Sequence, residues 1–266
     1  MKFKKNIANW ANKPIRKKYE SLIANIWGSM IILFNSIKVK NRVTYFLFSP
    51  DSQFYFKAYP EFDELFNKFI KGNRMNNCGD ISRLWFYILN IKQVLSDGIE
   101  GDFAELGVWK GNTASILAYY ASLHNKKVFL FDTYSGFDLK DLSGIDSNKS
   151  IDFNNTSIDL VKQVIGQQVN VCKFIKGRFP ESLIGPIISK KYSLVSLDCD
   201  LYEPMKAGLE FFYPLMPKGG VILLHDYSSK FWDGSKKAID EFCKSNNEYL
   251  VLLPDKSGSA CLRKSQ

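Results

Sequence analysis

Histidine is scarce in this 266-residue chain, which holds only His124 and His225. A metal site built mainly from imidazoles is therefore excluded, and a histidine relay has few possible members. The five cysteines are scattered, and no C-x-x-C pair occurs among them. This pattern favours reduced thiols in a cytoplasmic protein over the disulfide framework of a secreted one.

Long hydrophobic runs are also missing. The longest one covers residues 22–34 and is interrupted by Asn25, Gly28 and Ser29, so it is too short to span a bilayer as a helix. A long basic stretch precedes it and no clear cleavage site follows, so we expect no signal peptide. The run predicts an amphipathic helix that packs on its own domain, on a second copy in a homo-oligomer, or on a membrane surface.

The positive charge is confined to one end of the chain. Residues 1–42 hold ten basic residues and one acid, which accounts for the whole formal net charge of +9. The rest is neutral, although a basic protein at first suggests nucleic acid. We therefore expect no nucleic-acid partner, and a peripheral contact of residues 1–42 with the inner face of a membrane is one hypothesis.

Residues 1–75 read as a helical, basic N-terminal extension, and strands and helices alternate in residues 76–266. Asp80 is expected to cap a helix that runs to about Ser96. Strands are expected at 103–106, 127–132, 169–175, 192–198 and 221–224, and helices at 112–123, 157–167, 180–189, 203–215 and 235–245. A hairpin is expected at 249–253 and 259–263. This order predicts a Rossmann-like α/β fold, with helices on both faces of a parallel sheet and an antiparallel C-terminal hairpin.

The first chemical motif is E-x-G-x-x-x-G, formed by Glu105, Gly107 and Gly111 at the end of an expected strand. Its glycines let a ligand approach the backbone, but it is not the three-glycine dinucleotide fingerprint. Glu105 suits a cationic amino group, which S-adenosylmethionine (SAM) has. Asp132, with Thr133 beside it, ends the next strand, where it can bind ribose hydroxyls. A plain tight turn is the alternative interpretation of the glycines.

Two further expected strands end in acids, at Asp198-Cys-Asp200 and at His225-Asp226. Carboxylates brought together at one sheet edge repel one another unless they share a cation or a proton. A divalent metal held by Asp198, Asp226 and His225 would relieve this repulsion, with Mg²⁺ suited to the carboxylates and Mn²⁺ or another ion to the histidine. Alternatively, His225 only forms hydrogen bonds and Asp200 caps the following helix.

Five segments in order resemble sequence blocks of the macrocin/mycinamicin sugar O-methyltransferase family. The first is G-D-F-A-E-L-G-V-W-K-G at 101–111, and the last is P-K-G-G-V-I-L-L-H-D-Y at 217–227. Between them lie F-D-T-Y-S-G-F at 131–137, K-G-R-F-P-E-S-L at 176–183 and D-C-D-L-Y-E at 198–203. The resemblance covers roughly residues 75–266 and carries little into the first 75.

The resemblance implies a class I SAM-dependent methyltransferase with a seven-stranded sheet. It also implies Mg²⁺ bound at the positions of Asp198, His225 and Asp226. His225 stands where the family usually has Asp, which removes one negative charge. The identity of the metal, and the need for one, therefore stay open.

The sequence as a whole predicts a SAM-dependent, metal-assisted O-methyltransferase that acts on a hydroxyl of a sugar, in a polysaccharide or a glycosylated natural product. Asp198 is the first candidate for receiving the hydroxyl proton, and Asp200 is the next. The polar loop 133–156 is long enough to be a lid. N-terminal aromatics such as Tyr45 and Tyr59 could stack on sugars.

Two alternatives come from other classes. One is a non-catalytic protein of the same fold that docks on a membrane or an assembly through its basic arm. The other is a metal-dependent hydroxylase-like enzyme that uses the carboxylates on the same fold.

Overall fold

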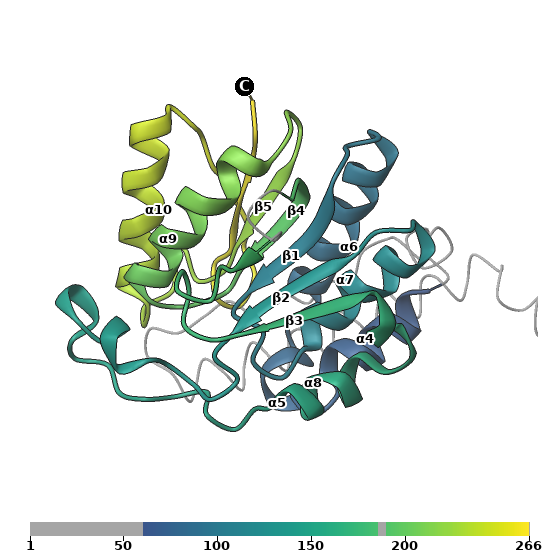
Figure 1. The fold of residues 1–266 in the computed structure, drawn as a ribbon, viewed down its shortest axis with the longest axis horizontal. Helices are drawn as coiled ribbons and strands as arrows, with labels where there is room; N and C mark the ends of the chain where they lie inside the picture. Colours follow the sequence, from purple (N-terminus) through teal and green to yellow (C-terminus); the bar gives the residue numbers. More distant parts are fainter. Residues whose placement is uncertain (1–60, 186–189, 266) are drawn as a thin grey trace, which may run out of the picture. The chain divides into compact units, whose positions relative to one another are not determined.

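The structure, a computed structural model, describes residues 61–185 and 190–265. Within them one sheet holds strands in the order β3-β2-β1-β4-β5-β7-β6 (Figure 1). The strands are β1 Asp102–Leu106, β2 Val128–Asp132, β3 Cys172–Lys176, β4 Tyr192–Leu197, β5 Val221–Leu224, β6 Val251–Leu252 and β7 Ala260–Arg263. The first five are parallel, and β7 runs antiparallel to both β5 and β6.

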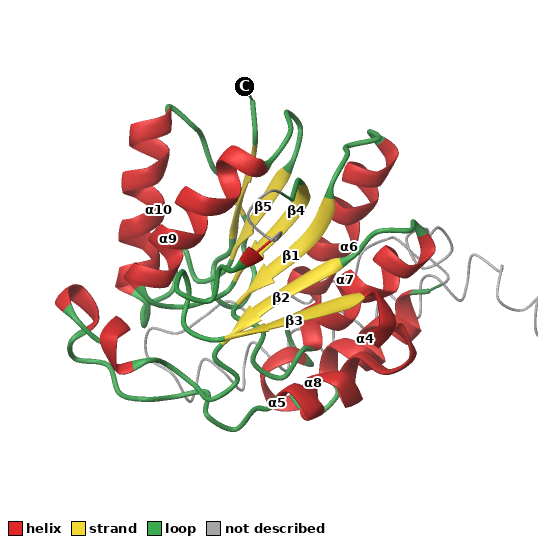
Figure 2. Cartoon of the chain, viewed as in Figure 1, coloured by secondary structure: helices red, strands yellow, loops and turns green. Residues whose placement is uncertain are grey.

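Helices cover both faces of this sheet (Figure 2). On one side lie α9 Tyr202–Phe212 and α10 Asp233–Asn246, and on the other lie α4 Phe62–Ile70, α6 Ile81–Ser96, α7 Asn112–Leu123 and α8 Ile158–Ile165. The short α5 Arg74–Asn77 connects α4 and α6. The Rossmann-like fold class is thus confirmed, with its seven strands and its C-terminal antiparallel hairpin.

The first described helix belongs to the same compact unit as the sheet, which covers Glu61–Gln266. Phe62 of α4 stacks on Trp85 of α6 with ring centroids 4.5 Å apart, and α4 also contacts α7. The domain boundary near residue 75 stays a prediction. The expected amphipathic helix at 22–34 and the N-terminal aromatics, which include Tyr45, Phe54, Tyr55, Phe56 and Tyr59, lie outside the described residues.

The core under α9 and α10 is built from aromatic rings that strands and helices contribute together. Phe131 of β2 and Tyr192 of β4 both contact Phe212 of α9, at ring-centroid distances of 5.5 and 5.1 Å. All three side chains are fully buried, and burying rings of this size contributes strongly to stability. These contacts hold β2, β4 and α9 together, and β2 and β4 are two of the strands whose ends form the site.

Three local expectations were wrong. Asp80 precedes α6 as expected, but its side chain makes no cap bond and instead accepts from the backbone N–H of Lys256 at 3.2 Å. Residues 179–182 form a turn and residues 183–184 are irregular, so no α-helix begins at Pro180, and the left-handed φ of 65° at Gly185 does not continue one. The strand expected from residue 169 begins at Cys172, after a 3₁₀ turn.

The parallel register brings the predicted site together. Leu106 of β1 pairs with Phe131 of β2 and with Leu197 of β4, and Leu197 pairs with Leu224 of β5. The residues that directly follow β1, β4 and β5 therefore emerge side by side with Asp132, the last residue of β2, at one edge of the sheet. Among the described residues, no helix is long and apolar enough to cross a bilayer.

Candidate active site

A cavity of about 320 Å³ lies at the carboxyl ends of the parallel strands. This is the position at which open α/β sheets bind ligands, and the size suits a small molecule. The predicted site residues that line it are Gly107, Asp132, Thr133, Asp198, Asp200, His225 and Asp226. Glu105 and Gly111 lie outside this lining.

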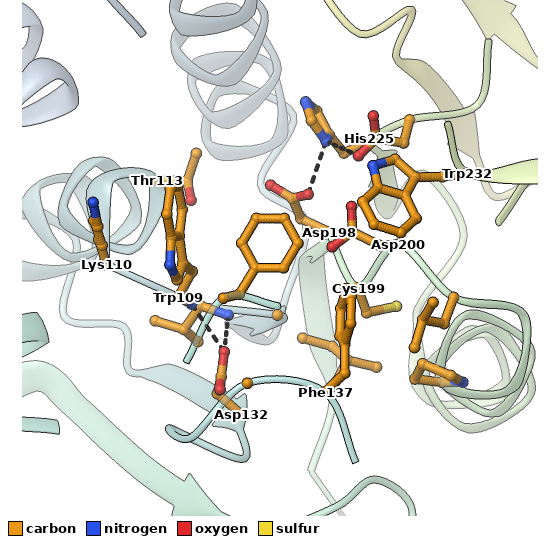
Figure 3. Close-up of a pocket in the computed structure, with 18 of the residues that line it drawn as sticks. Trp109, Lys110, Thr113, Asp132, Phe137, Asp198, Cys199, Asp200, His225 and Trp232 are labelled. Carbon is orange, nitrogen blue, oxygen red and sulfur yellow. Dashed lines mark hydrogen bonds and ion pairs between the residues drawn. The ribbon is translucent and has the colours of Figure 1, made fainter. Parts of the chain in front are cut away.

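Gly107 and Asp132 shape the wall formed by the turn after β1. Gly107 has φ +87°, and a Cβ there would lie 1.9 Å from the carbonyl oxygen of Asp198. Only glycine fits this close approach. The Asp132 carboxylate accepts the backbone N–H groups of Val108 and Trp109, at 2.6 and 2.9 Å (Figure 3), and that of Tyr134 at 2.6 Å. Asp132 therefore ties together the two turns that follow β1 and β2.

Gly111 and Glu105 lie next to this wall but do not line the cavity. Gly111 precedes α7 with φ +81°, and a Cβ there would lie 2.7 Å from a methyl group of Val161 in α8. Glu105 is fully buried and its Oε1 accepts from the Ser196 hydroxyl at 3.4 Å, while Oε2 has no hydrogen-bond partner among the described residues. Burial raises the pKa of Glu105 to about 8, although the neighbouring Thr113 acts in the opposite direction.

Asp198, His225 and Asp226 meet at the ends of β4 and β5, as the sequence predicts (Figure 3). His225 Nδ1 lies 2.8 Å from Asp198 Oδ1 and 2.6 Å from Asp226 Oδ2. Burial raises the pKa of Asp198, but His225 and Arg83 outweigh it and hold the pKa below its usual value. Burial is the largest single influence and lowers the pKa of His225, but Asp198 and Asp226 together outweigh burial and Arg83 and raise it to about 10.

Arg83 of α6 is a site residue that the sequence analysis missed. Its Nη1 lies 2.5 Å from His225 Nε2 and 3.9 Å from Asp198 Oδ2. A guanidinium only donates, so Nε2 must accept and the ring proton must sit on Nδ1. The raised pKa of His225 would favour a second ring proton on Nε2, but that proton would lie between two nitrogen donors, so the contact with Arg83 keeps the ring neutral. The signal available in the sequence was Arg83 itself, a charged residue on a largely apolar helix, four positions before Tyr87.

Asp200 faces the cavity instead of capping the following helix. It has φ +62° and its carboxyl lies within hydrogen-bonding reach of Asp226, which also has a left-handed φ of 59°. Burial, reinforced by Asp226, raises the pKa of Asp200 well above its usual value. The first backbone N–H of α9, from Tyr202, is accepted by Asp146 at 2.7 Å, so the expected cap comes from the loop 133–156.

The carboxylates of Asp146 and Asp141 hold the loop 133–156 in position. Asp146 is fully buried between the starts of α9 and α10, with its Oδ2 2.2 Å from where a Cβ on Gly234 would lie. Asp141 accepts from Arg178 Nε and Nη2, at 2.9 and 2.6 Å. Since Asp141 also lines the cavity, these contacts hold the loop against the site.

Aromatic side chains form one wall of the cavity, and the sequence analysis did not single them out. Phe153 contacts Trp109, Phe137 and Trp232 at ring-centroid distances of 5.1, 5.2 and 6.1 Å. Phe137 and Trp232 lie 5.7 Å apart, and Figure 3 places them near Asp200. These four rings are far apart in the sequence, so only the folded chain reveals that they share one wall.

Residues 81–250 match the family model described as macrocin-O-methyltransferase (TylF). The chain belongs to the macrocin-O-methyltransferase family. This match covers the whole acidic cluster and the glycine turn, and it confirms the resemblance seen in the sequence.

The curated proteins similar to this macrocin-O-methyltransferase family member include two O-methyltransferases with glycosylated compounds in their names. It is 24% identical over 164 residues to the 8-demethyl-8-(2,3-dimethoxy-alpha-L-rhamnosyl)-tetracenomycin-C 4'-O-methyltransferase of Streptomyces olivaceus. It is 25% identical over 153 residues to the mycinamicin III 3''-O-methyltransferase of Micromonospora griseorubida. The matches cover 57% and 52% of this chain, and the chain spans 61% and 59% of those relatives.

Solved structures of two methyltransferases share the fold of this macrocin-O-methyltransferase family member. The O-methyltransferase NovP superposes with a TM-score of 0.58 at 20% identity, covering 70% of this chain and 81% of that one. The calicheamicin methyltransferase CalS11 gives 0.56 at 19% identity, covering 85% of this chain and 98% of that one. Identities this low establish the shared fold alone.

The divalent ion implied by the macrocin-O-methyltransferase resemblance fits these contacts poorly. One ligand atom from each of Asp198, His225 and Asp226 lies within 4.8 Å of the others, as a metal site requires. Neighbouring ligands of an octahedral Mg²⁺, each about 2.1 Å from the ion, would lie about 3.0 Å apart. The separations of 2.8 and 2.6 Å are instead hydrogen-bond lengths that share the proton on His225 Nδ1.

Proposed function

We propose that this chain is a SAM-dependent O-methyltransferase that methylates a hydroxyl group of a sugar. The observation that carries the proposal is one cavity that is lined by the glycine turn of Gly107, the Asp132 carboxylate and the Asp198–His225–Asp226 cluster. Membership of the macrocin-O-methyltransferase family supports the reaction class. The names of two similar curated proteins, which act on a rhamnosyl tetracenomycin and on mycinamicin III, support a glycosylated acceptor.

The cofactor end of the cavity consists of Gly107, Asp132 and Thr133, with Glu105 and Gly111 behind them. When bound, SAM supplies the methyl group as a sulfonium. Gly107 leaves room for a ligand beside the backbone, and Asp132 keeps lone pairs that can accept ribose hydroxyls. Glu105 is fully buried behind them, so pairing with the cationic amino group of SAM requires it to release the proton that its raised pKa favours.

At the other end, Asp198 is the proposed acceptor of the hydroxyl proton. It lines the cavity, its side chain keeps 18% of its exposure, and Oδ1 is oriented by His225 Nδ1. Displacement at a sulfonium depends mainly on alignment, so holding the hydroxyl in place should carry much of the rate. Asp200 is the second candidate, and it lines the same cavity. The proposed mechanism needs no divalent metal, because the contacts of the cluster are those of a shared proton.

The acceptor end is apolar and aromatic, which suits a pyranose. Phe137, Phe153 and Trp232 form a wall on which the C–H face of a sugar can stack, while hydroxyls meet the carboxylates. A polysaccharide unit and a glycosylated natural product would both present this face. Cytoplasmic location, contact of residues 1–42 with anionic membrane, and a homo-oligomeric state complete the proposal.

Calorimetry with SAM and with its demethylated product tests the reaction class. We expect Kd values below about 1 mM, and transfer of labelled methyl to at least one member of a panel of deoxysugar nucleotides and glycosides. A folded protein that binds neither ligand would refute the proposal. That result would favour the non-catalytic alternative, in which the basic arm docks the fold on a membrane. A metal-dependent oxygenation without SAM would favour the hydroxylase-like alternative.

A further inference from the structure

Arg83 brings a buried positive charge to the carboxylate cluster of Asp198 and Asp226. Its side chain keeps only 11% of its exposure, and its guanidinium lies over the Phe69 ring, 5.5 Å from the centroid. Arginine stays charged even when it is buried, so this charge requires nearby carboxylates. Asp198 provides one at 3.9 Å, and His225 lies in direct contact at 2.5 Å.

The contact of Arg83 with His225 decides what the imidazole can do. A histidine that binds a metal through Nδ1 offers the Nδ1 lone pair, and its proton then sits on Nε2. Here Nε2 lies 2.5 Å from a group that only donates. A ring that accepts from Arg83 carries its proton on Nδ1, between Asp198 and Asp226, and has no lone pair there for an ion.

The charges of the cluster lead to the same conclusion. The sequence resemblance places a third carboxylate at position 225, and three carboxylates at these positions repel one another unless they share a cation or a proton. At the same three positions this chain has two carboxylates, Asp198 and Asp226, which face a neutral donor and a guanidinium, while the nearby Asp200 lies within hydrogen-bonding reach of Asp226. The positive charge that an ion would supply is already built into α6.

We propose that Arg83, acting through His225, takes the place of the divalent cation, so that methyl transfer by this protein is independent of metal. This inference rests on the proposed SAM-dependent function. Arg83 and His225 are then positioning residues, which orient Asp198 toward the acceptor hydroxyl and offset its charge. The Asp198, His225 and Asp226 set predicted as metal ligands serves here as a hydrogen-bonded unit.

Nitrogen NMR of the full chain tests the tautomer directly, because the protein has only two histidines. Long-range ¹H–¹⁵N spectra of ¹⁵N-histidine-labelled protein should show His225 with a protonated Nδ1 and an unprotonated Nε2. The variant His124→Asp assigns the two rings without touching the site, since His124 follows α7. A ring of His225 protonated at Nε2 alone would overturn the proposal. Arg83→Met should shift the Nε2 resonance, whereas the remote control Arg263→Met should not.

Metal binding is measured with Mn²⁺ as the probe, by electron paramagnetic resonance of the full chain. We expect no site tighter than about 1 mM, and methyl transfer that is unchanged by EDTA and by added Mg²⁺. The proposal fails if EDTA abolishes transfer and Mg²⁺ or Mn²⁺ restores it. It also fails if wild-type protein binds Mn²⁺ tightly and Asp198→Asn removes that site.

Restoring the third carboxylate at position 225 should convert the cluster into a metal-binding site. The double variant Arg83→Met/His225→Asp should bind Mn²⁺ at least about tenfold more tightly than wild type, and His124→Asp with Arg263→Met is its matched control. If the double variant does not fold, as judged by circular dichroism, His225→Asp alone makes the same comparison. Equal Mn²⁺ binding in folded variant and wild type would contradict the charge argument. SAM calorimetry on the same samples separates this failure from failure of the proposed function, because SAM binding needs no metal.

Discussion

Asp198 is the residue on which the contacts of the acceptor end converge. Its Oδ1 meets His225, its Oδ2 faces Arg83, and its carbonyl oxygen fixes how closely Gly107 approaches. A side chain held at both carboxylate oxygens, on a backbone packed against Gly107, has little freedom to lose when a substrate binds. The geometry therefore assigns Asp198 an orienting and proton-accepting role that a smaller or neutral side chain cannot replace.

Asp198→Asn tests this role in the reaction. We expect kcat to fall by about 10²–10⁴, because the amide cannot accept the hydroxyl proton, while the Kd for SAM changes little. Initial rates and calorimetry measure the two quantities. The exposed-pair variant Asp97→Asn serves as the control. A kcat within about twofold of wild type would remove Asp198 from the mechanism.

Glu105 has a testable effect on stability. Its folded pKa of about 8 exceeds the ordinary glutamate pKa of 4.5, so between these pH values the folded state holds a proton that the unfolded state has released. Stability from this group is therefore present at low pH and is lost as the pH rises from about 4.5 to 8. Glu105→Gln should raise the free energy of unfolding at pH 8 by on the order of 3 kcal/mol and leave it nearly unchanged at pH 4. Urea unfolding at both pH values measures this difference, and equal pH dependence would contradict it.

At the scale of elements, the loop 133–156 gains its position from the ends of α9 and α10. Asp146 accepts from the first backbone N–H of α9 and packs against Gly234 of α10. A carboxylate at a helix N-terminus satisfies free N–H groups and also interacts favourably with the helix dipole. The loop is thereby anchored to the same helices that cover the core beneath the site.

Asp146→Ala should release this anchor. We expect a loss of about 1–2 kcal/mol in stability, seen as a fall in Tm of about 2–8 °C, together with a higher KM for the acceptor. Asp152→Ala, an exposed carboxylate of the same loop, is the matched control. Differential scanning fluorimetry measures the change in Tm, and steady-state kinetics measure the KM for the acceptor. An unchanged acceptor KM would show that the loop does not shape that end of the cavity.

The turn between β1 and α7 depends on a residue without a side chain, Gly107. At Gly107, a Cβ would lie 1.9 Å from a backbone oxygen, and the left-handed φ adds strain. Gly107→Ala should therefore abolish SAM binding or folding, with a stability cost above about 3 kcal/mol. Gly79→Ala, where a Cβ meets nothing within 4 Å, should be tolerated. Calorimetry and thermal melts compare the two, and normal SAM binding by Gly107→Ala would refute the predicted close approach.

On the scale of the whole molecule, charge and fold are separated along the chain. The net charge of +9 resides in residues 1–42, and the remaining chain, which includes the acidic cavity rim, is neutral. An acidic rim suits a cationic cofactor, whereas a basic arm suits an anionic surface. The two regions therefore predict two separate binding partners.

Vesicle co-sedimentation tests the arm. The full chain should pellet with vesicles rich in anionic lipid and remain in the supernatant with neutral ones, because each Lys or Arg near the surface contributes about 1 kcal/mol. Binding should weaken as salt is raised. A chain that lacks residues 1–42 should not pellet with either. Equal binding by the shortened chain would place the membrane contact elsewhere or exclude it.

The sequence by itself determined the parallel sheet, its helices and the gathering of acids at one edge. This was possible because apolar periodicity and strand-end acids are local signals, and parallel register carries them to the same edge. It could not place Glu105 behind the wall, or find the ring wall of Phe137, Phe153 and Trp232, because those contacts join distant segments.

Only the tertiary structure decided the chemistry of His225. Its neighbour Arg83 lies 142 positions earlier in the sequence, on a helix whose pattern indicated nothing but packing. The sequence predicted an imidazole next to carboxylates, which is compatible with a metal ligand and with a hydrogen-bond donor. The guanidinium at Nε2 selects the donor, because a proton can occupy only one of the two nitrogens of a neutral ring.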